Sequence, residues 1–262
     1  MTAIVGWTNY VKTGASIAGS SAAGLGAGNL QDDNGSPSVA WQTAGGVTTA
    51  AGGAAITIWP PGTALPWRAF GVFRTNLTAS AAITVSLYDG SGTLVYQGVF
   101  SGLSAGSGQI VGVLPAAVIA DYCTIGIDNG GNPDGFLNIP LAFAGDVWAP
   151  LSGVSWNTTA GRDSAVQEAQ SRGGQDFPTL QWQRRRWDIE FAGIRAAELW
   201  ARVGDLDRSA RAGGNVLFVP ETTSVNIQSE ATLGRLTSLS DVSYPHMAGD
   251  RRAWRARVSE RV

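Results

Sequence analysis

The chain has 262 residues, enough for two domains that each form a hydrophobic core. A net charge of −2 and a pI near 5.4 give no electrostatic reason to expect a nucleic-acid partner. No stretch reaches the roughly 18 consecutive apolar residues of a membrane span, and the first residues lack a signal-peptide pattern. We therefore expect a soluble protein, made in the cytoplasm, that binds no nucleic acid and does not insert into membranes.

Charge and glycine divide the chain into two parts. Residues 1–160 contain three basic and seven acidic residues, no glutamate, and 26 of the 35 glycines. Residues 161–262 contain fifteen arginines and thirteen acids. The contrast predicts two domains with different roles: a β-sandwich over 1–155 and an α+β assembly domain over 179–262. The polar, glycine-containing segment 156–178 between them reads as a linker or long loop.

The first part reads as short strands separated by glycine-rich turns, with no helical period. Residues 68–74 and 82–88 alternate apolar and small or polar side chains, and an apolar run at 55–59 ends at two prolines. A further strand is expected over 93–100, after the turn Asp-Gly-Ser-Gly. About one strand per dozen residues is typical of an all-β sandwich.

The predicted sandwich has an unusual surface composition. Because it holds no glutamate and a single lysine, its exposed faces consist mainly of Ser, Thr, Asn, Gly and Ala. Such a surface suits close packing against other protein copies. A GC-rich genome, which favours Ala, Gly and Arg over Lys, explains the composition equally well.

The second part contains one clear helix within a series of strands. Over 195–212, Leu199, Val203 and Leu206 recur at helical spacing, and two glycines follow. Strands are expected over 180–191, 216–219, 233–239 and 253–258. The order predicts an antiparallel sheet with one helix on one face, so that the whole chain is mainly β.

Catalytic chemistry is poorly represented. His246 is the sole histidine and lies in an apparent loop, and Cys123 is the sole cysteine, expected to be a buried structural thiol. Paired carboxylates could support glycoside hydrolysis. However, the candidate aspartates all lie within two residues of Gly, Asn or Pro, where turns use them: Asp32, Asp33, Asp89, Asp128, Asp134 and Asp146. We expect no catalytic residue and no cofactor.

Three groups of residues are candidates for binding. Asp32, Asp128 and Asp134 lie in Asp/Asn loops that could hold calcium, although neither loop has the spacing of a helical calcium site. The run Arg184, Arg185 and Arg186 lies in a predicted strand, with the middle residue on the opposite face, and is expected to pair with acids of this chain or of a partner subunit. Trp59, Trp67 and Trp148 could stack on sugars if exposed, although tryptophan in a β-rich core is commoner.

A resemblance to a known family rests on several short matches in sequence order. A Ser/Ala-rich segment at 15–21 leads into Asn29-Leu30-Gln31-Asp32 and then Ser38-Val39-Ala40-Trp41. Further matches lie at 70–77, 83–89, 95–96, 128–135, 137–139 and 143–145. Together they resemble the discoidin-like, galactose-binding-type jelly rolls of minor tail proteins of tailed bacteriophages. The second part is similar to the domain that follows such a jelly roll: an arginine-rich strand, a helix, residues 215–220, 234–236 and a strand ending near 260.

The resemblance implies a virion structural protein at the tail tip or baseplate, present in several copies and made in the bacterial host. Its partners would be other tail proteins and copies of itself. The alternative is a module that binds a glycan or another molecule of the host surface through exposed tryptophans and Asp/Asn loops.

Overall fold

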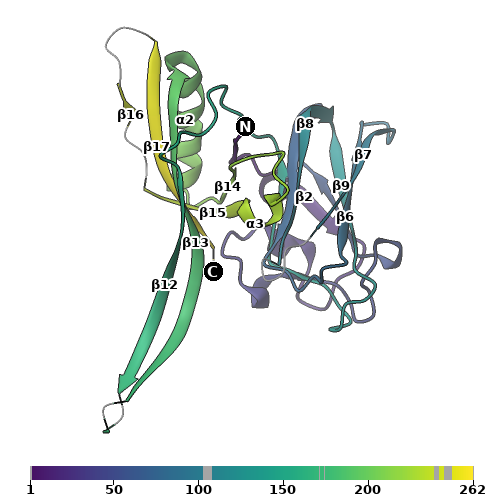
Figure 1. The fold of residues 1–262 in the computed structure, drawn as a ribbon. Helices are drawn as coiled ribbons and strands as arrows, with labels where there is room; N and C mark the ends of the chain where they lie inside the picture. The colour runs from purple at the N-terminus through teal and green to yellow at the C-terminus, as the bar shows by residue number, and fades with distance from the viewer. Residues whose placement is uncertain are drawn as a thin grey trace.

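The computed structural model describes residues 2–102, 108–170, 172–173, 175–238, 242–244 and 250–261. The fold is mainly β, as the sequence predicts. Figure 1 shows three features: a β-sandwich of jelly-roll type, a second sheet covered by one helix, and a long hairpin that projects away from both.

Two antiparallel sheets form the sandwich. The five-stranded sheet has the order β2 (Ala15–Ala18), β4 (Ala55–Trp59), β9 (Tyr122–Asp128), β6 (Ala82–Tyr88) and β7 (Leu94–Ser101). The three-stranded sheet has the order β11 (Leu141–Gly145), β5 (Leu65–Phe73) and β8 (Ile110–Ala120). Shorter elements close its ends: α1 (Tyr10–Thr13), β3 (Trp41–Gln42), β10 (Asn138–Ile139), and 3₁₀ turns at Ala27–Gln31, Pro37–Val39 and Ala50–Gly52.

Alternation along the strands produces the sandwich core. Ile56, Ile83 and Leu87 are fully buried and pack with Trp67 and Phe70 of the facing sheet in one cluster. Neighbours along each strand point to the opposite face, which is the outer surface of the five-stranded sheet but is buried against other parts of the chain on the three-stranded sheet. The strands predicted at 55–59 and 82–88 have those bounds, and those predicted at 68–74 and 93–100 correspond to β5 and β7.

A further sheet, called the second sheet because it lies outside the sandwich, contains most of the strands of the second part of the chain. Its order is β1 (Ile4–Gly6), β14 (Val216–Val219), β15 (Thr232–Ser238), β17 (Arg251–Glu260), β13 (Asp176–Arg195) and β12 (Thr159–Gln170). A short strand, β16 (Val242–Ser243), also pairs with β17, and the helix α3 (Ile227–Glu230) precedes β15. The strand predicted at 216–219 is β14, and those predicted at 233–239 and 253–258 fall on β15 and β17, although Leu239 lies outside the described residues.

The helix α2 (Ala196–Arg211) covers one face of this sheet (Figure 1). Leu199, Val203 and Leu206 are its buried residues and join a cluster with Phe191 and Trp254. The predicted helix is therefore confirmed to within one residue at each end. Among the described residues, no helix is both long and apolar enough to cross a membrane.

The two parts of the chain are interlocked. β1, at the start of the chain, pairs antiparallel with β14, and Ile4 lies opposite Val219. A separate apolar cluster joins the three-stranded sheet of the sandwich to the second sheet. Phe143 and Val111 come from the sandwich, and Leu217 and Leu233 come from the second sheet. The first strand thus belongs to the second sheet, although composition grouped it with the sandwich.

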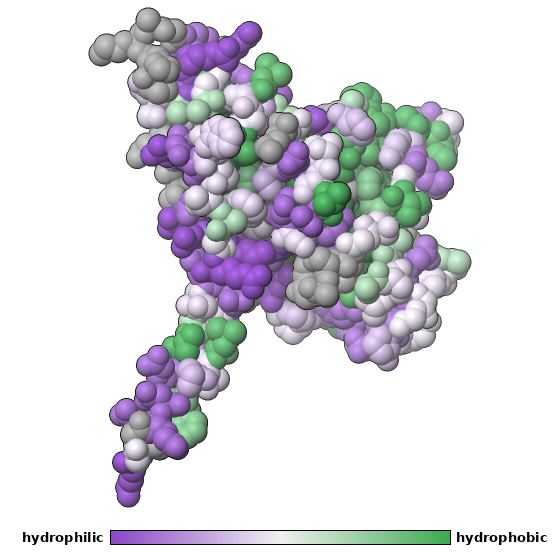
Figure 2. All heavy atoms as spheres, viewed as in Figure 1, coloured by the Kyte–Doolittle hydropathy of each residue, from purple (hydrophilic) through white to green (hydrophobic). Residues whose placement is uncertain are grey.

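The segment 156–178, expected to be a linker, is mostly strand. It forms β12 and the first residues of β13, which pair from Thr159 opposite Asp188 to Gln170 opposite Asp176, with one irregularity beside Ala165. The linker prediction was wrong because residues at the outer end of this hairpin are exposed on both faces, so no apolar alternation marks the strands. Figures 1 and 2 show this hairpin as an arm that extends well beyond the body of the molecule.

Candidate functional site

The base of the β12–β13 arm carries a ladder of ion pairs on one face. Asp163 lies opposite Arg184 across the hairpin; its carboxylate accepts a hydrogen bond from Arg186 Nη1 at 2.7 Å and lies 3.4 Å from Arg184 Nε. Asp188 continues the ladder, at 3.1 Å from Arg186 Nε and 2.5 Å from Arg257 Nε. The chain's own carboxylates therefore pair with the arginines expected to make assembly contacts.

Arg185 points to the opposite side of the strand, as the alternation predicted. Its guanidinium binds both carboxylate oxygens of Glu260, at 2.5 and 3.0 Å, and donates to the carbonyls of Ser229 and Ala231. A further hydrogen bond of 2.8 Å reaches Gln109 Oε1, in the sandwich part. Arg185 thus joins the arm, the second sheet and the sandwich.

The outer half of the arm exposes apolar side chains. Val166, Phe177, Leu180 and Trp182 are 50%, 54%, 58% and 38% exposed. Figure 2 shows hydrophobic residues in green between hydrophilic ones along the arm. A two-stranded hairpin without further packing is marginally stable in water. The arm therefore presents apolar surface and a sheet edge in a form that a neighbouring molecule can cover.

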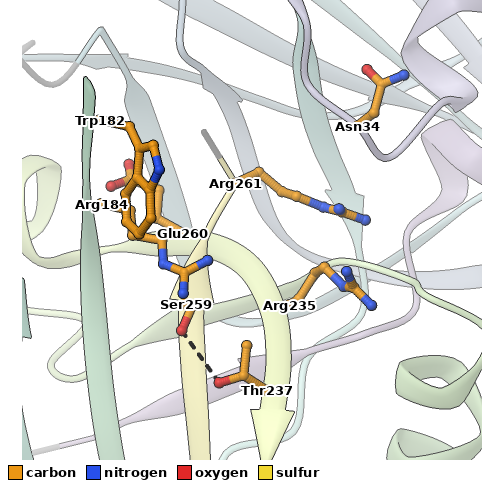
Figure 3. A pocket seen from close by; sticks show the side chains of 8 residues that line it. All are labelled: Asn34, Trp182, Arg184, Arg235, Thr237, Ser259, Glu260 and Arg261. Carbon is orange, nitrogen blue, oxygen red and sulfur yellow. Dashed lines mark hydrogen bonds between the residues drawn. The ribbon is translucent and has the colours of Figure 1, made fainter. Parts of the chain in front are cut away.

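A pocket of about 310 Å³ lies where the arm meets the body. Figure 3 shows its lining, which comes from three strands, the sandwich loop and the last residues of the chain. The lining residues are Asn34, Trp182, Arg184, Arg235, Thr237, Ser259, Glu260 and Arg261. Arg235 lies in the strand predicted at 233–239 and Arg261 follows the last predicted strand, but nothing in the sequence indicates that either meets Arg184.

The outer face of the five-stranded sheet is a second candidate surface. Tyr122 lies between two other aromatic rings, stacked on Trp59 at 5.5 Å between centroids and on Tyr88 at 4.9 Å. The three residues end or begin neighbouring strands, and Tyr88 lies opposite Tyr122 in the register. The rest of this face carries uncharged side chains such as Thr57, Thr124, Gln97 and Val99.

Only one of the three predicted sugar-stacking tryptophans is available at the surface. Trp59 is 41% exposed. Trp67 is fully buried, and its indole N–H donates to Ala120 O, so the prediction for Trp67 is wrong. Trp148 is 6% exposed and its indole N–H donates to Glu198 Oε1, so that prediction is wrong as well. Both rings contribute to cores, where their polar atoms have partners.

The predicted calcium residues accept hydrogen bonds within one loop or between loops. Asp32 accepts a hydrogen bond from the backbone N–H of Asn34, Asp128 from that of Ala50, and Asp134 from the amide of Asn76. Among the described residues, no group of three or more His, Cys, Asp or Glu side chains is arranged to hold a metal ion.

The remaining sequence candidates also have local roles or lie outside the description. Asp89 accepts from the side chain and backbone of Ser91 and from Thr93, and these hydrogen bonds lower its pKa. Cys123 is buried, as predicted, and burial raises the pKa of its thiol well above the usual value. His246 lies outside the described residues.

Comparisons with known proteins place carbohydrate-binding modules among the similar structures. No family model and no curated protein matches the chain. Solved structures that align include the lectin domain of lectinolysin complexed with Lewis B antigen, at 15% identity over 52% of this chain and 94% of that one, with a TM-score of 0.41. A Streptococcus pneumoniae fucose binding module aligns at 12% identity over 53% and 95%, also with a TM-score of 0.41. The family 32 CBM from C. perfringens NanJ in complex with galactose aligns at 14% identity over 54% and 98%, with a TM-score of 0.40. Likeness at this level gives no information on a ligand of this chain.

Proposed function

We propose that the chain is a structural protein without catalytic activity that assembles through protein–protein contacts, with copies of itself and with other proteins of a bacteriophage tail tip. The observation that carries the assembly role is the β12–β13 arm, which projects from the body with four apolar side chains 38% to 58% exposed. The tail tip as the place of assembly rests on the sequence resemblance described above.

The energetics favour a partner for the arm. Fully burying a Leu or Phe side chain contributes roughly 1.5–3 kcal/mol, and about half of that remains available at Phe177 and Leu180. Burying the exposed parts of four such side chains would contribute roughly 4 kcal/mol per contact before the cost of association. In a closed ring each copy makes that contact twice, once with each neighbour, so modest contacts accumulate.

A shortened arm tests this function. Because Ala165 lies directly opposite Trp182, residues 166–181 can be replaced by Asn-Gly, which makes a two-residue hairpin. We expect the chain with the shortened arm to fold normally and to be absent from purified particles. Light scattering should show monomers in place of oligomers. As a matched control, Gln167→Ser changes the arm without removing apolar surface. Undiminished assembly of the shortened chain would refute the proposal.

A second function, glycan binding by the sandwich, is favoured by Trp59. One face of its ring stacks on Tyr122, and the residue opposite it on β2 is the small, exposed Ala15. The other face is therefore open to a sugar ring, which stacks on indole through its C–H groups. A glycan array probed with the full chain and with Trp59→Ala tests this function; equal signals from both proteins, or none from either, would exclude this site.

A further inference from the structure

The pocket at the base of the arm has an unbalanced charge. Among the described residues, Arg184, Arg235 and Arg261 line it, and Glu260 is the one lining acid. Both oxygens of that carboxylate are already bound by Arg185, which lies outside the lining. Arg184 pairs at 3.4 Å with Asp163, which lies outside the lining, so the excess positive charge of the described lining residues lies on Arg235 and Arg261.

Two of these arginines lie close together as like charges. Figure 3 shows the side chains of Arg235 and Arg261 running in the same direction, across the pocket from Trp182 and Arg184. Burial and the positive charge of Arg235 lower the pKa of Arg261, while Asp33 and Asp32 partly oppose this effect. Arg261 is held by Asn215 Oδ1 and by the carbonyl of Gly213. The side chain of Arg235 makes no hydrogen bond or ion pair with any described residue.

Arg184 lines the pocket on the side of Trp182. Its Nε atom is buried without a hydrogen-bond partner, because the 3.4 Å approach to Asp163 lacks hydrogen-bond geometry. Its guanidinium lies 5.0 Å from the centre of the Trp182 ring, which holds the two side chains together. A guanidinium group such as that of Arg235 recognises a carboxylate through two parallel hydrogen bonds.

The other lining groups suit a hydroxylated ring. Ser259 is buried and its hydroxyl lies 3.3 Å from that of Thr237, so the exposed Thr237 hydroxyl is the one that can donate to or accept from a sugar hydroxyl. The amide of Asn34 stands at the opposite side of the pocket (Figure 3), and the indole of Trp182 supplies an apolar wall. A cavity of about 310 Å³ lies at the small end of ligand sites, the size for one or two sugar rings.

We propose that this pocket binds an acidic saccharide, with the carboxylate of a sugar acid placed between Arg235 and Arg261 and the sugar extending across the pocket toward Trp182. This site lies in the second sheet, away from the sandwich face that carries Trp59. It depends neither on oligomerisation nor on glycan binding by the sandwich.

Titration calorimetry on the full chain tests the proposal, with glucuronic acid and N-acetylneuraminic acid as probes and glucose, acetate and sulfate as references. We expect the sugar acids to bind at least tenfold more tightly than glucose or acetate. Sulfate binding as tight as the sugar acids would reduce the site to a simple anion site, and no binding of either acid would overturn the proposal.

Arg235→Gln is the decisive variant, because the Arg235 side chain makes no hydrogen bond or ion pair with the described residues, so that its replacement removes no contact within the fold. We expect it to weaken sugar-acid binding by tenfold or more, the effect of one charge-assisted hydrogen bond, without changing the melting temperature. The matched control is Arg208→Gln on α2, whose side chain is 81% exposed. Trp182→Ala should reduce the preference for sugar acids over acetate; unchanged binding in both pocket variants would place the ligand elsewhere.

Discussion

Arg185 should be the most costly arginine of the chain to remove. Replacing it by alanine deletes hydrogen bonds to Glu260, Ser229, Ala231 and Gln109 in one step. The side chains of Arg185 and Glu260 are each 19% exposed, so water only partly compensates the carboxylate that is left. The same change also removes a direct bond between the second sheet and the sandwich.

The magnitude follows from burial. Breaking a fully buried ion pair by removing one partner costs about 3–5 kcal/mol, and an exposed pair contributes about 0–1 kcal/mol. A pair that is four-fifths buried lies near the lower end of the first range, so Arg185→Ala should lower the free energy of unfolding by about 3 kcal/mol. For a chain of this size that corresponds to a fall in melting temperature of about 8 °C.

Urea unfolding monitored by tryptophan fluorescence measures this loss. Arg255→Ala is the matched control, because Arg255 pairs with Glu190 across the same two strands but its side chain is 66% exposed. We expect the control to change stability by less than about 1 kcal/mol. Equal losses in the two variants would refute the argument that burial decides the strength of these pairs.

Three further predictions follow from the packing and the pKa values. Gly145→Ala should destabilise the fold by more than about 2 kcal/mol, because the added Cβ would overlap the Thr8 carbonyl. Gly204→Ala should stabilise the fold by up to about 1 kcal/mol, because there is open space around this position of α2. Equal melting temperatures of the two variants would contradict this reasoning. Trp67→Ala should lower the free energy of unfolding by about 3–5 kcal/mol, because Trp67 is fully buried. Trp59→Ala should lower it by less than about 1.5 kcal/mol, because Trp59 is 41% exposed. The reverse order in denaturant titrations would refute the assignment of Trp67 to the core. Burial and Asp146 raise the pKa of Tyr10 to about 12. The stability that this shift contributes is therefore complete below pH 10 and is lost as the pH rises toward 12. Absorbance titration should show one tyrosine that ionises near pH 12, and this transition should be missing in Tyr10→Phe.

Strand periodicity made most of the fold predictable. The apolar alternation of 82–88 and the helical spacing of Leu199, Val203 and Leu206 each report a face that a core covers, so they located β6 and α2. The outer end of the arm has no apolar alternation, because its residues face water on both sides. β1 was missed for a different reason: its partner, β14, lies more than 200 residues away in the sequence.

The candidate sites were less predictable than the elements. The alternation in the arginine run correctly separated Arg185 from its two neighbours, but the carboxylates that pair with them, Asp163 and Glu260, become neighbours only through strand register. A tryptophan's exposure was similarly hidden: Trp59 and Trp67 both lie in strands, and only the facing sheet decides which one is covered. The pocket at the base of the arm joins residues from four distant segments and leaves no local signal.

The pairing of β1 with β14 ties the order of synthesis to the order of folding. Residues 4–6 leave the ribosome some two hundred codons before their hydrogen-bonding partners at 217–219. At roughly 5–20 residues per second, the first strand waits about ten seconds or more with its edge unmatched. A fragment starting after residue 155 would lack this strand and expose Leu217 and Leu233, so truncated versions of the second part should aggregate during expression.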